Sequence, residues 1–462
     1  MRARLSVRDG QIDASSLAWR ESGVAGCATA IRVGLRTSRQ TVESALQRYS
    51  ATEPDVCAFT WLDADRALRL ADARDRHPSI QPLHGVPIGV KDIFDTRGIP
   101  TRLGSLLFER RVPARSAEVV LRLERAGAIV LGKTVTTEFA FLAPGPTRNP
   151  HDVTRSPGGS SQGSAAAVAA GVVPGAIGSQ TNGSTIRPAA FCGVVGFKPT
   201  AGRIPRRGVM SFSHTLDQVG VFGRSVDDVR LLAAVLAGDS PGAWYSEPPT
   251  SPRLAIVPTG DWSVASSAMQ HRFLADVESL TARGARVASP PLPDGIDDAS
   301  DLVGRVMAFE SLRTIGRRVP RNSPDISWQT RDLWARGSAI SERDHLRILR
   351  RRRQLIASFD LWLSPFDAIL TLPAPGEAPD ASSTGDPRFC SRWTLVGAPA
   401  LVLPTGYGPN GLPIGLQLVG HRGDDAGLLG VGRWAESVLK PVYVRPDGPN
   451  AEGCDSPVDR GP

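Results

Sequence analysis

The chain has 462 residues, 41% of them hydrophobic, and a formal net charge of +8. This composition is typical of a globular protein with a large core, and the polar first thirty residues and broken apolar runs argue against a signal peptide and a membrane span. We therefore expect a cytoplasmic protein. Its five cysteines are widely spaced and its seven histidines are scattered, which argues against a disulfide framework and a metal site, and no cofactor is expected.

The excess of positive charge does not indicate nucleic acid as a partner. The densest basic runs are "RTIGRRVPR" at 313–321 and "RILRRRR" at 347–353. No helix-turn-helix, zinc-finger or RNA-binding aromatic motif accompanies them. They are typical of solvated helix faces in an arginine-rich protein.

The first half of the chain alternates predicted helices and strands. Apolar spacing near 3.6 within 35–76 predicts two helices, the first capped by Ser38 or Thr41. The run "GVPIGVKDIF" predicts a short strand that carries Lys91. In "SAEVVLRLERAGAIVLGKT" an amphipathic helix, a Gly127 cap and a strand follow one another. This alternation is typical of an α/β protein.

The second half continues the pattern after a long Gly/Ser/Pro/Asn loop at 144–164. "SAAAVAAG" predicts a small-residue helix, "VVPGAIGSQ" a buried strand and "SVDDVRLLAAVLAG" a capped helix. Residues 265–360 are helix-rich, and "AILTLPAP", "APALVLPTG" and "PIGLQLVG" predict further strands. No linker divides the chain, so we predict one large α/β domain with a disordered tail at 446–462, where apolar residues are rare.

Lysine is rare and unevenly placed. It stands only at positions 91, 133, 198 and 440, while the other fifty basic residues are arginine. Arginine stays charged at any working pH, so a side chain that must lose its proton cannot be arginine. Lys91, Lys133 and Lys198 are therefore candidates for chemistry.

Two polar loops interrupt apolar surroundings, "SPGGSSQGS" at 156–164 and "GSQTNGST" at 178–185. Such loops cradle phosphates or present backbone N–H groups to a developing negative charge. Neither GxxxxGK[ST] nor a strand-borne GxGxxG is present, which argues against phosphate. Residues 159–163 match GxSxG, the nucleophile elbow, with Ser161 as nucleophile; the residues before them do not predict the strand that the elbow needs, and this alternative stays open.

The stretch "PGGSSQGSAAAVAAGVVPGAIGSQTNGSTIRPAAFCGVVGFKPT" at 157–200 resembles the core of the amidase signature family. "LHGVPIGVKDIFDTRGIPT", "GAIVLGKTVTTEFAF", "HTLDQVGVFGRSVDD" and "WTLVGAPALVLPTG" are also similar to family segments. The resemblance implies a single domain at 31–445, after a partly irregular segment 1–30, with core motifs at 84–220 and a helical elaboration at about 265–360. Its fold would be a central mixed sheet flanked by helices on both faces.

The resemblance also implies an activity and its residues. The family hydrolyses carboxylic amides through a covalent acyl-serine intermediate, with Lys91 matching the general base, Ser160 the bridging cis-serine and Ser184 the nucleophile. Burial would lower the pKa of such a lysine. The implied oxyanion hole consists of the backbone N–H groups of Thr181, Asn182, Gly183 and Ser184, and the implied supporting residues are Gly158, Gly159 and Arg187.

Arg187 is expected to donate to carbonyls of the nucleophile loop. Lys133 and Lys198 are then expected to be structural. The match to the family pattern has four departures: Gln180 stands where Asp is usual, Asn182 and Gln162 where Gly is usual, and Arg187 lies one residue late.

Two alternatives to a self-contained amidase follow from the same residues. One is the A subunit of a tRNA-dependent glutamine amidotransferase, which needs partner subunits. The other is a non-catalytic scaffold or binding protein on the amidase fold. For the amidase, the expected partner is a small-molecule amide, and a homodimer is one assembly that the sequence leaves open.

Overall fold

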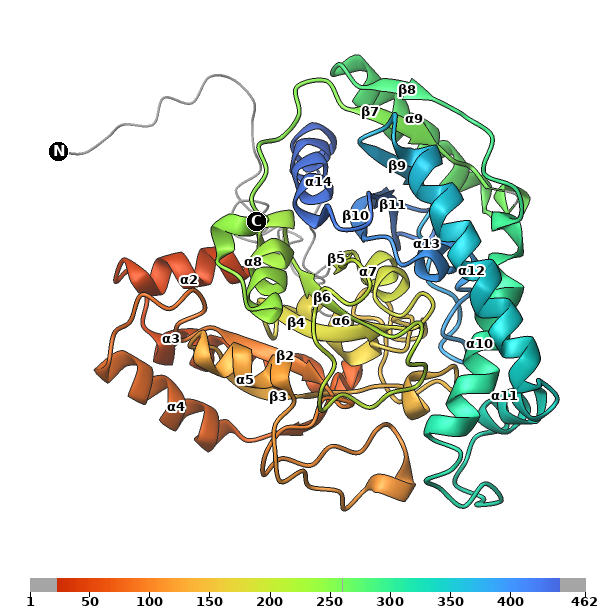
Figure 1. Ribbon diagram of the computed structural model, residues 1–462. Coiled ribbons are helices and arrows are strands. Elements are labelled where there is room, and N and C mark those ends of the chain that lie inside the picture. Colours follow the sequence, from red (N-terminus) through yellow and green to blue (C-terminus); the bar gives the residue numbers. More distant parts are fainter. Residues whose placement is uncertain (1–22, 260, 441–462) are drawn as a thin grey trace, which may run out of the picture.

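The computed structural model describes residues 23–259 and 261–440, and their strands form one mixed sheet (Figure 1). The sheet has eleven strands in the order β1-β3-β2-β4-β6-β5-β10-β11-β9-β7-β8. The strands are β1 Phe59–Leu62, β2 Pro87–Lys91, β3 Ile129–Thr134, β4 Gly175–Gln180, β5 Val195–Lys198, β6 Gln218–Gly223, β7 Arg253–Ile256, β8 Arg286–Ala288, β9 Ala368–Thr371, β10 Ala400–Tyr407 and β11 Pro413–Val419.

Helices cover both faces of this sheet, as the sequence predicted. The α-helices are α2 Val24–Arg32, α3 Ser38–Val56, α4 Ala64–Arg76, α5 Glu118–Arg125, α6 Gln162–Ala169, α7 Ile186–Cys192, α8 Val226–Ala237, α9 Ser267–Ala282, α10 Ala299–Thr314, α11 Trp328–Ser338, α12 Glu342–Leu363, α13 Arg388–Val396 and α14 Asp425–Leu439. One core cluster joins the sheet to α2, α5, α8, α9 and α14, and a second joins it to α3, α4, α6 and α7.

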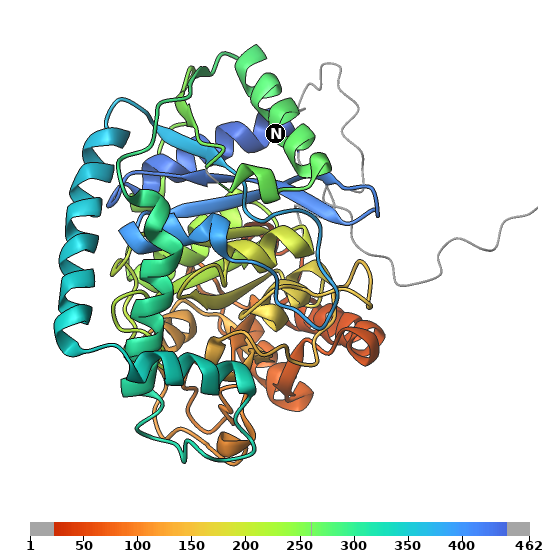
Figure 2. The same cartoon turned by 90° about the vertical axis from the view of Figure 1, so that its right-hand side faces the viewer.

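Each central strand contributes side chains to both core clusters, because successive side chains of a strand point to opposite faces of the sheet. In β10, Leu401 and Leu403 belong to the first cluster, whereas Ala400 and Val402 belong to the second. Apolar residues therefore follow one another without alternation in the central strands. The long α12 lies along the outside of the molecule, with α10 and α11 beside it (Figure 2).

Most predicted helices and strands are confirmed, with changes at their ends. Thr37, rather than Ser38 or Thr41, caps α3, because its side chain accepts the N–H of Gln40 while the Gln40 side chain accepts the N–H of Thr37. Gly127 follows α5 with φ +91°, a conformation that favours glycine. The predicted tail at 446–462 and most of the segment 1–30 lie outside the described residues.

The arrangement of parallel strands positions the site. β2 pairs in parallel with β3 and β4, whereas β4 pairs antiparallel with β6. The carboxyl ends of β2 and β4 therefore meet at one edge of the sheet. Lys91 ends β2, and the second Gly/Ser/Asn loop starts directly after Gln180 at the end of β4. Across 23–259 and 261–440, every helix is too short or too polar to cross a membrane.

Candidate active site

Lys91 is the centre of a buried cluster of hydroxyl groups. Its Nζ lies 2.8 Å from Ser160 Oγ, 3.0 Å from Ser161 Oγ and 2.8 Å from Ser179 Oγ. The parallel pairing of Val90 with Ile177 accounts for the contact with Ser179, which lies two residues further along β4. The residues Ser160 and Ser161 come from the loop that leads into α6.

The surroundings of Lys91 favour its neutral form. Its side chain is fully buried, and this burial lowers the pKa of Lys91 well below its usual value, while the carboxyl group of Asp217 partly opposes the shift. Ser161 donates its proton to the Ser179 carbonyl at 3.1 Å, so it accepts a hydrogen bond from Lys91. A neutral amine with two N–H donors then has one lone pair left to accept the hydroxyl proton of Ser160 or Ser179.

The loop before α6 contains a cis peptide bond between Gly159 and Ser160. Arg187 holds this peptide, because its Nη2 donates to the Gly159 carbonyl at 2.7 Å and its Nε donates to the Thr384 carbonyl at 2.7 Å. The expectation that Arg187 donates to carbonyls of the nucleophile loop is therefore wrong for its guanidinium group, although its backbone N–H donates to the Gly183 carbonyl at 3.0 Å. Gly158 has φ +81°, and a Cβ there would lie 2.8 Å from the backbone of Pro188, so only glycine fits.

The loop between β4 and α7 carries Ser184 at the wall of a cavity of about 150 Å³. Thr181, Asn182 and Gly183 line the same cavity. Within the described chain, the Ser184 hydroxyl makes no hydrogen bond, and no hydrogen bond has the backbone N–H of Asn182, Gly183 or Ser184 as its donor. The loop thus combines an available hydroxyl with available N–H donors, which is the arrangement an oxyanion hole requires.

The alternative elbow at Ser161 is wrong. Residues 141–160 form turns, bends and isolated bridges where an elbow requires a strand. Ser161 is fully buried, and its Oγ accepts the N–H of Ser179 at 3.2 Å in addition to its contacts with Lys91 and the Ser179 carbonyl. Ser161 therefore anchors α6 to β4.

Lys133 and Lys198 hold loops, in agreement with their predicted structural role. Lys133 donates to the Phe94 carbonyl at 2.8 Å and lies 3.2 Å from a carboxylate oxygen of Asp92. Lys198 donates to the carbonyls of Pro199 and Ala398 and to Gln218 Oε1. Burial lowers the pKa of Lys133 to about 8 and that of Lys198 to about 7. Among the described residues, neither side chain makes a hydrogen bond to Lys91 or to a serine of the two loops.

Three residues that contact the nucleophile loop were not predicted from the sequence. Asp217 accepts the hydroxyl of Thr181 at 2.7 Å, and burial raises the pKa of Asp217 to about 6. Thr394 and Ser391, both on α13, hydrogen-bond to Asn182, from which they are more than 200 residues away in the chain. The only sequence signal for the three was their position in or next to the family-like segments "HTLDQVGVFGRSVDD" and "WTLVGAPALVLPTG".

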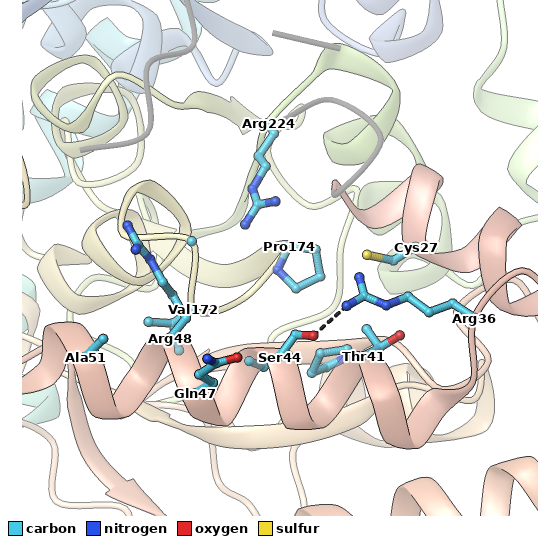
Figure 3. A pocket seen from close by; sticks show the side chains of 13 residues that line it. Cys27, Arg36, Thr41, Ser44, Gln47, Arg48, Ala51, Val172, Pro174 and Arg224 are labelled. Carbon is cyan, nitrogen blue, oxygen red and sulfur yellow. Dashed lines mark hydrogen bonds between the residues drawn. The ribbon is translucent and has the colours of Figure 1, made fainter. Parts of the chain in front are cut away.

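A larger cavity of about 440 Å³ lies elsewhere, between α3 and the segment before β4 (Figure 3). Three arginines line it: Arg36, Arg48 and Arg224. Arg36 donates to Ser44 Oγ at 2.5 Å, and burial raises the pKa of Cys27, which keeps that sulfur a thiol. None of the predicted catalytic residues lines this cavity, and the described part of the chain holds no group of three or more metal-ligating side chains.

Comparison with known proteins agrees with this geometry. A family profile described as Amidase matches residues 40–429. The A subunit of the glutamyl-tRNA(Gln) amidotransferase from Chloroflexus aggregans is 32% identical, with 92% of this chain and 98% of the relative covered, and that from Anaeromyxobacter sp. (strain K) is 35% identical, with 93% and 98% covered.

Solved structures resemble the whole domain. An amidase crystal structure aligns with a TM-score of 0.82 at 31% identity, covering 90% of this chain and 99% of that one. The native peptide amidase from Stenotrophomonas maltophilia aligns with a TM-score of 0.81 at 26% identity, covering 94% and 99%. The chain therefore belongs to the amidase signature family, whose members hydrolyse amide C–N bonds.

Proposed function

We propose that the protein is a serine amidase in which Lys91, Ser160 and Ser184 form a proton relay. The observation that carries the proposal is the fully buried Lys91 with a lowered pKa, whose Nζ is hydrogen-bonded at 2.8 Å to Ser160 Oγ. A lysine held neutral at working pH can accept a proton, as general base catalysis requires. The Ser184 hydroxyl at the cavity wall is available for attack.

The relay proceeds in two halves. As substrate binds, the Ser184 and Ser160 hydroxyls come into hydrogen-bond contact; Lys91 takes the proton of Ser160, Ser160 takes that of Ser184, and Ser184 Oγ bonds to the amide carbon. The N–H groups of residues 181–184 hold the oxyanion. Ser160 then gives a proton to the leaving nitrogen and recovers one from the Lys91 ammonium, and the C–N bond breaks. Water next attacks the acyl-Ser184 ester, with Ser160 and neutral Lys91 accepting its proton and Ser160 returning one to Ser184.

The direct test is covalent trapping. Intact-protein mass after exposure to a fluorophosphonate should show one adduct, and peptide mapping should place it on Ser184. The Lys91→Met variant should react more slowly because its Ser184 lacks the relay base. An adduct on Ser161 would overturn the assignment of the nucleophile. No adduct between pH 6 and 10, together with no hydrolysis of any amide, would favour the non-catalytic scaffold.

The cavity beside Ser184 indicates the class of amide. Six of its thirteen lining residues carry apolar side chains, and two others are arginines, Arg187 and Arg336; the apolar six are Ala140, Phe141, Leu142, Met307, Leu333 and Pro387. A cavity of about 150 Å³ is large enough for one benzene ring. We infer a substrate whose acyl group has an apolar part about the size of one aromatic ring, which the apolar side chains of the wall remove from water.

Gly304 on α10 provides a test of this inference. It lines the cavity, and a Cβ built on it has no heavy atom within 4 Å, so a larger side chain enters open space. Gly304→Leu should lower kcat/KM for benzamide by at least about tenfold, which is the effect expected when a few methylene groups of the substrate no longer fit a pocket. The kcat/KM for acetamide should change little. Gly242→Leu is the matched control, since its Cβ also meets open space and it lies outside the cavity. Equal losses for both amides would contradict the inferred cavity.

A second candidate function is supported by the relatives, which are A subunits of glutamyl-tRNA(Gln) amidotransferases. In that role the chain would release ammonia from glutamine within a complex. The apolar side chains of the cavity disfavour the charged amino-acid group of glutamine, whereas Arg187 and Arg336 on the same wall offer positive charge to its α-carboxylate. Glutaminase activity that appears only with partner subunits, and exceeds benzamide hydrolysis by the isolated chain, would favour the amidotransferase.

A further inference from the structure

Two hydrogen bonds from α13 hold Asn182, the residue that stands where the family usually has glycine. Thr394 Oγ1 donates to the Asn182 carbonyl at 2.5 Å, and Ser391 Oγ donates to Asn182 Oδ1 at 2.8 Å. Thr394 is fully buried and Ser391 is 1% exposed. Both donors are thus buried while Asn182 itself is half-buried, and α13 fixes both the main chain and the side chain of Asn182.

Gln180, the second departure from the family pattern, completes the same network. Its Oε1 accepts the N–H groups of Thr185 at 2.8 Å and Ile186 at 3.0 Å, which leaves its Nε2 to donate to Thr394 Oγ1 at 3.0 Å. A threonine hydroxyl has one proton. Because Thr394 accepts from Gln180, its own proton is directed to the Asn182 carbonyl. A carboxylate at position 180 has no proton to donate, so it cannot order the network in this direction.

The consequence concerns the N–H of Gly183. The peptide between Asn182 and Gly183 is trans and planar, so its C=O and N–H point in opposite directions. Anchoring the carbonyl on α13 therefore sets the direction of the Gly183 N–H, which belongs to the loop that lines the cavity beside Ser184.

We propose that Thr394 and Ser391 are positioning residues for the oxyanion hole, and that Gln180 orients Thr394 for this task. The two unusual residues of the nucleophile loop are thus matched by partners on α13. The proposal rests on the proposed function, because it assigns the Gly183 N–H to the oxyanion of an acyl transfer at Ser184.

The test compares Thr394→Val, Thr394→Ser and Thr371→Val. Thr371 is the matched control, since it is fully buried on β9 and its hydroxyl has no hydrogen-bond partner among the described residues. Losing one oxyanion donor costs about 10²–10³ in rate, and a misdirected donor should cost part of that, so Thr394→Val should lower kcat by about 10- to 100-fold with little change in KM. Thr394→Ser keeps the hydroxyl and should restore most of kcat.

Binding of an inhibitor that mimics the tetrahedral intermediate distinguishes a role of Thr394 in positioning the oxyanion hole from a general loss of structure. Phenylboronic acid bonds to a serine nucleophile and places an oxygen in the oxyanion hole, so its affinity should fall in Thr394→Val by about as much as kcat. Gln180→Glu should lower kcat and boronate affinity by a similar factor. In the double variant Gln180→Glu/Thr394→Val, the fold-loss of kcat should be smaller than the product of the two single fold-losses, since both residues act through the Thr394 hydroxyl.

The outcomes distinguish the two proposals. Wild-type labelling by fluorophosphonate at a residue other than Ser184 would overturn the proposed function. If the wild type is labelled at Ser184 but Thr394→Val keeps wild-type kcat and boronate affinity, the positioning role is overturned and the proposed function stands. Equal losses in Thr394→Val and Thr371→Val would also overturn the positioning role.

Discussion

Replacing Ser184 with alanine is expected to lower kcat/KM for amide hydrolysis by at least about 10⁴-fold, because no bond between the enzyme and the acyl group can then form. The variant should fold normally, since the Ser184 hydroxyl makes no hydrogen bond within the described chain and little packing is lost. The measurement is hydrolysis of benzamide by purified wild type and Ser184→Ala, together with the thermal midpoint of each.

Ser437→Ala is the control for this prediction. Ser437 is exposed on α14 and its hydroxyl donates only to the Trp434 carbonyl of the same helix, so the same chemical change should leave kcat/KM unaltered. Activity of Ser184→Ala within tenfold of wild type would contradict the assignment of Ser184 as nucleophile.

Lys91→Met is expected to lower kcat/KM by about 10³-fold or more, since the serine nucleophile then has no general base. In the wild type, the base works only when neutral, so kcat/KM should rise with pH through the pKa of Lys91. Burial lowers that pKa well below its usual value. The rise of kcat/KM with pH should therefore be complete well below pH 10.5, which is the ordinary pKa of a lysine side chain.

Asp217→Asn checks the sign of this pH dependence. The negative charge of Asp217 raises the pKa of Lys91, and burial raises the pKa of Asp217 itself to about 6. Removing the charge should move the acidic limb of the kcat/KM profile to lower pH, whereas Lys91→Met should lose that limb. A limb that persists unchanged in Lys91→Met would show that another group titrates in the reaction.

The sequence was informative wherever a local pattern or a continuous motif carried the signal. The period of apolar residues predicted α3 and α4, the capping pattern predicted α8, and short apolar runs predicted β2, β3 and β10. The scarcity of lysine drew attention to Lys91, and the family-like stretch identified both serine loops. Helix α7 was not predicted, because all seven of its residues are buried and they show no polar face.

The tertiary structure alone decided which distant groups meet. The Arg187 side chain donates to the cis-serine loop instead of the nucleophile loop, and Asn182 is held from α13 more than 200 residues away. The parallel pairing of β2 with β4 brings Lys91 to Ser179, the folded loop before α6 brings it to Ser160 and Ser161, and burial in the folded core lowers its pKa. By itself, the sequence determined the elements, the family and the candidate catalytic residues, since these depend on neighbours in the chain. The orientation of each polar group depends on partners that folding brings together, so it could not be predicted from local sequence.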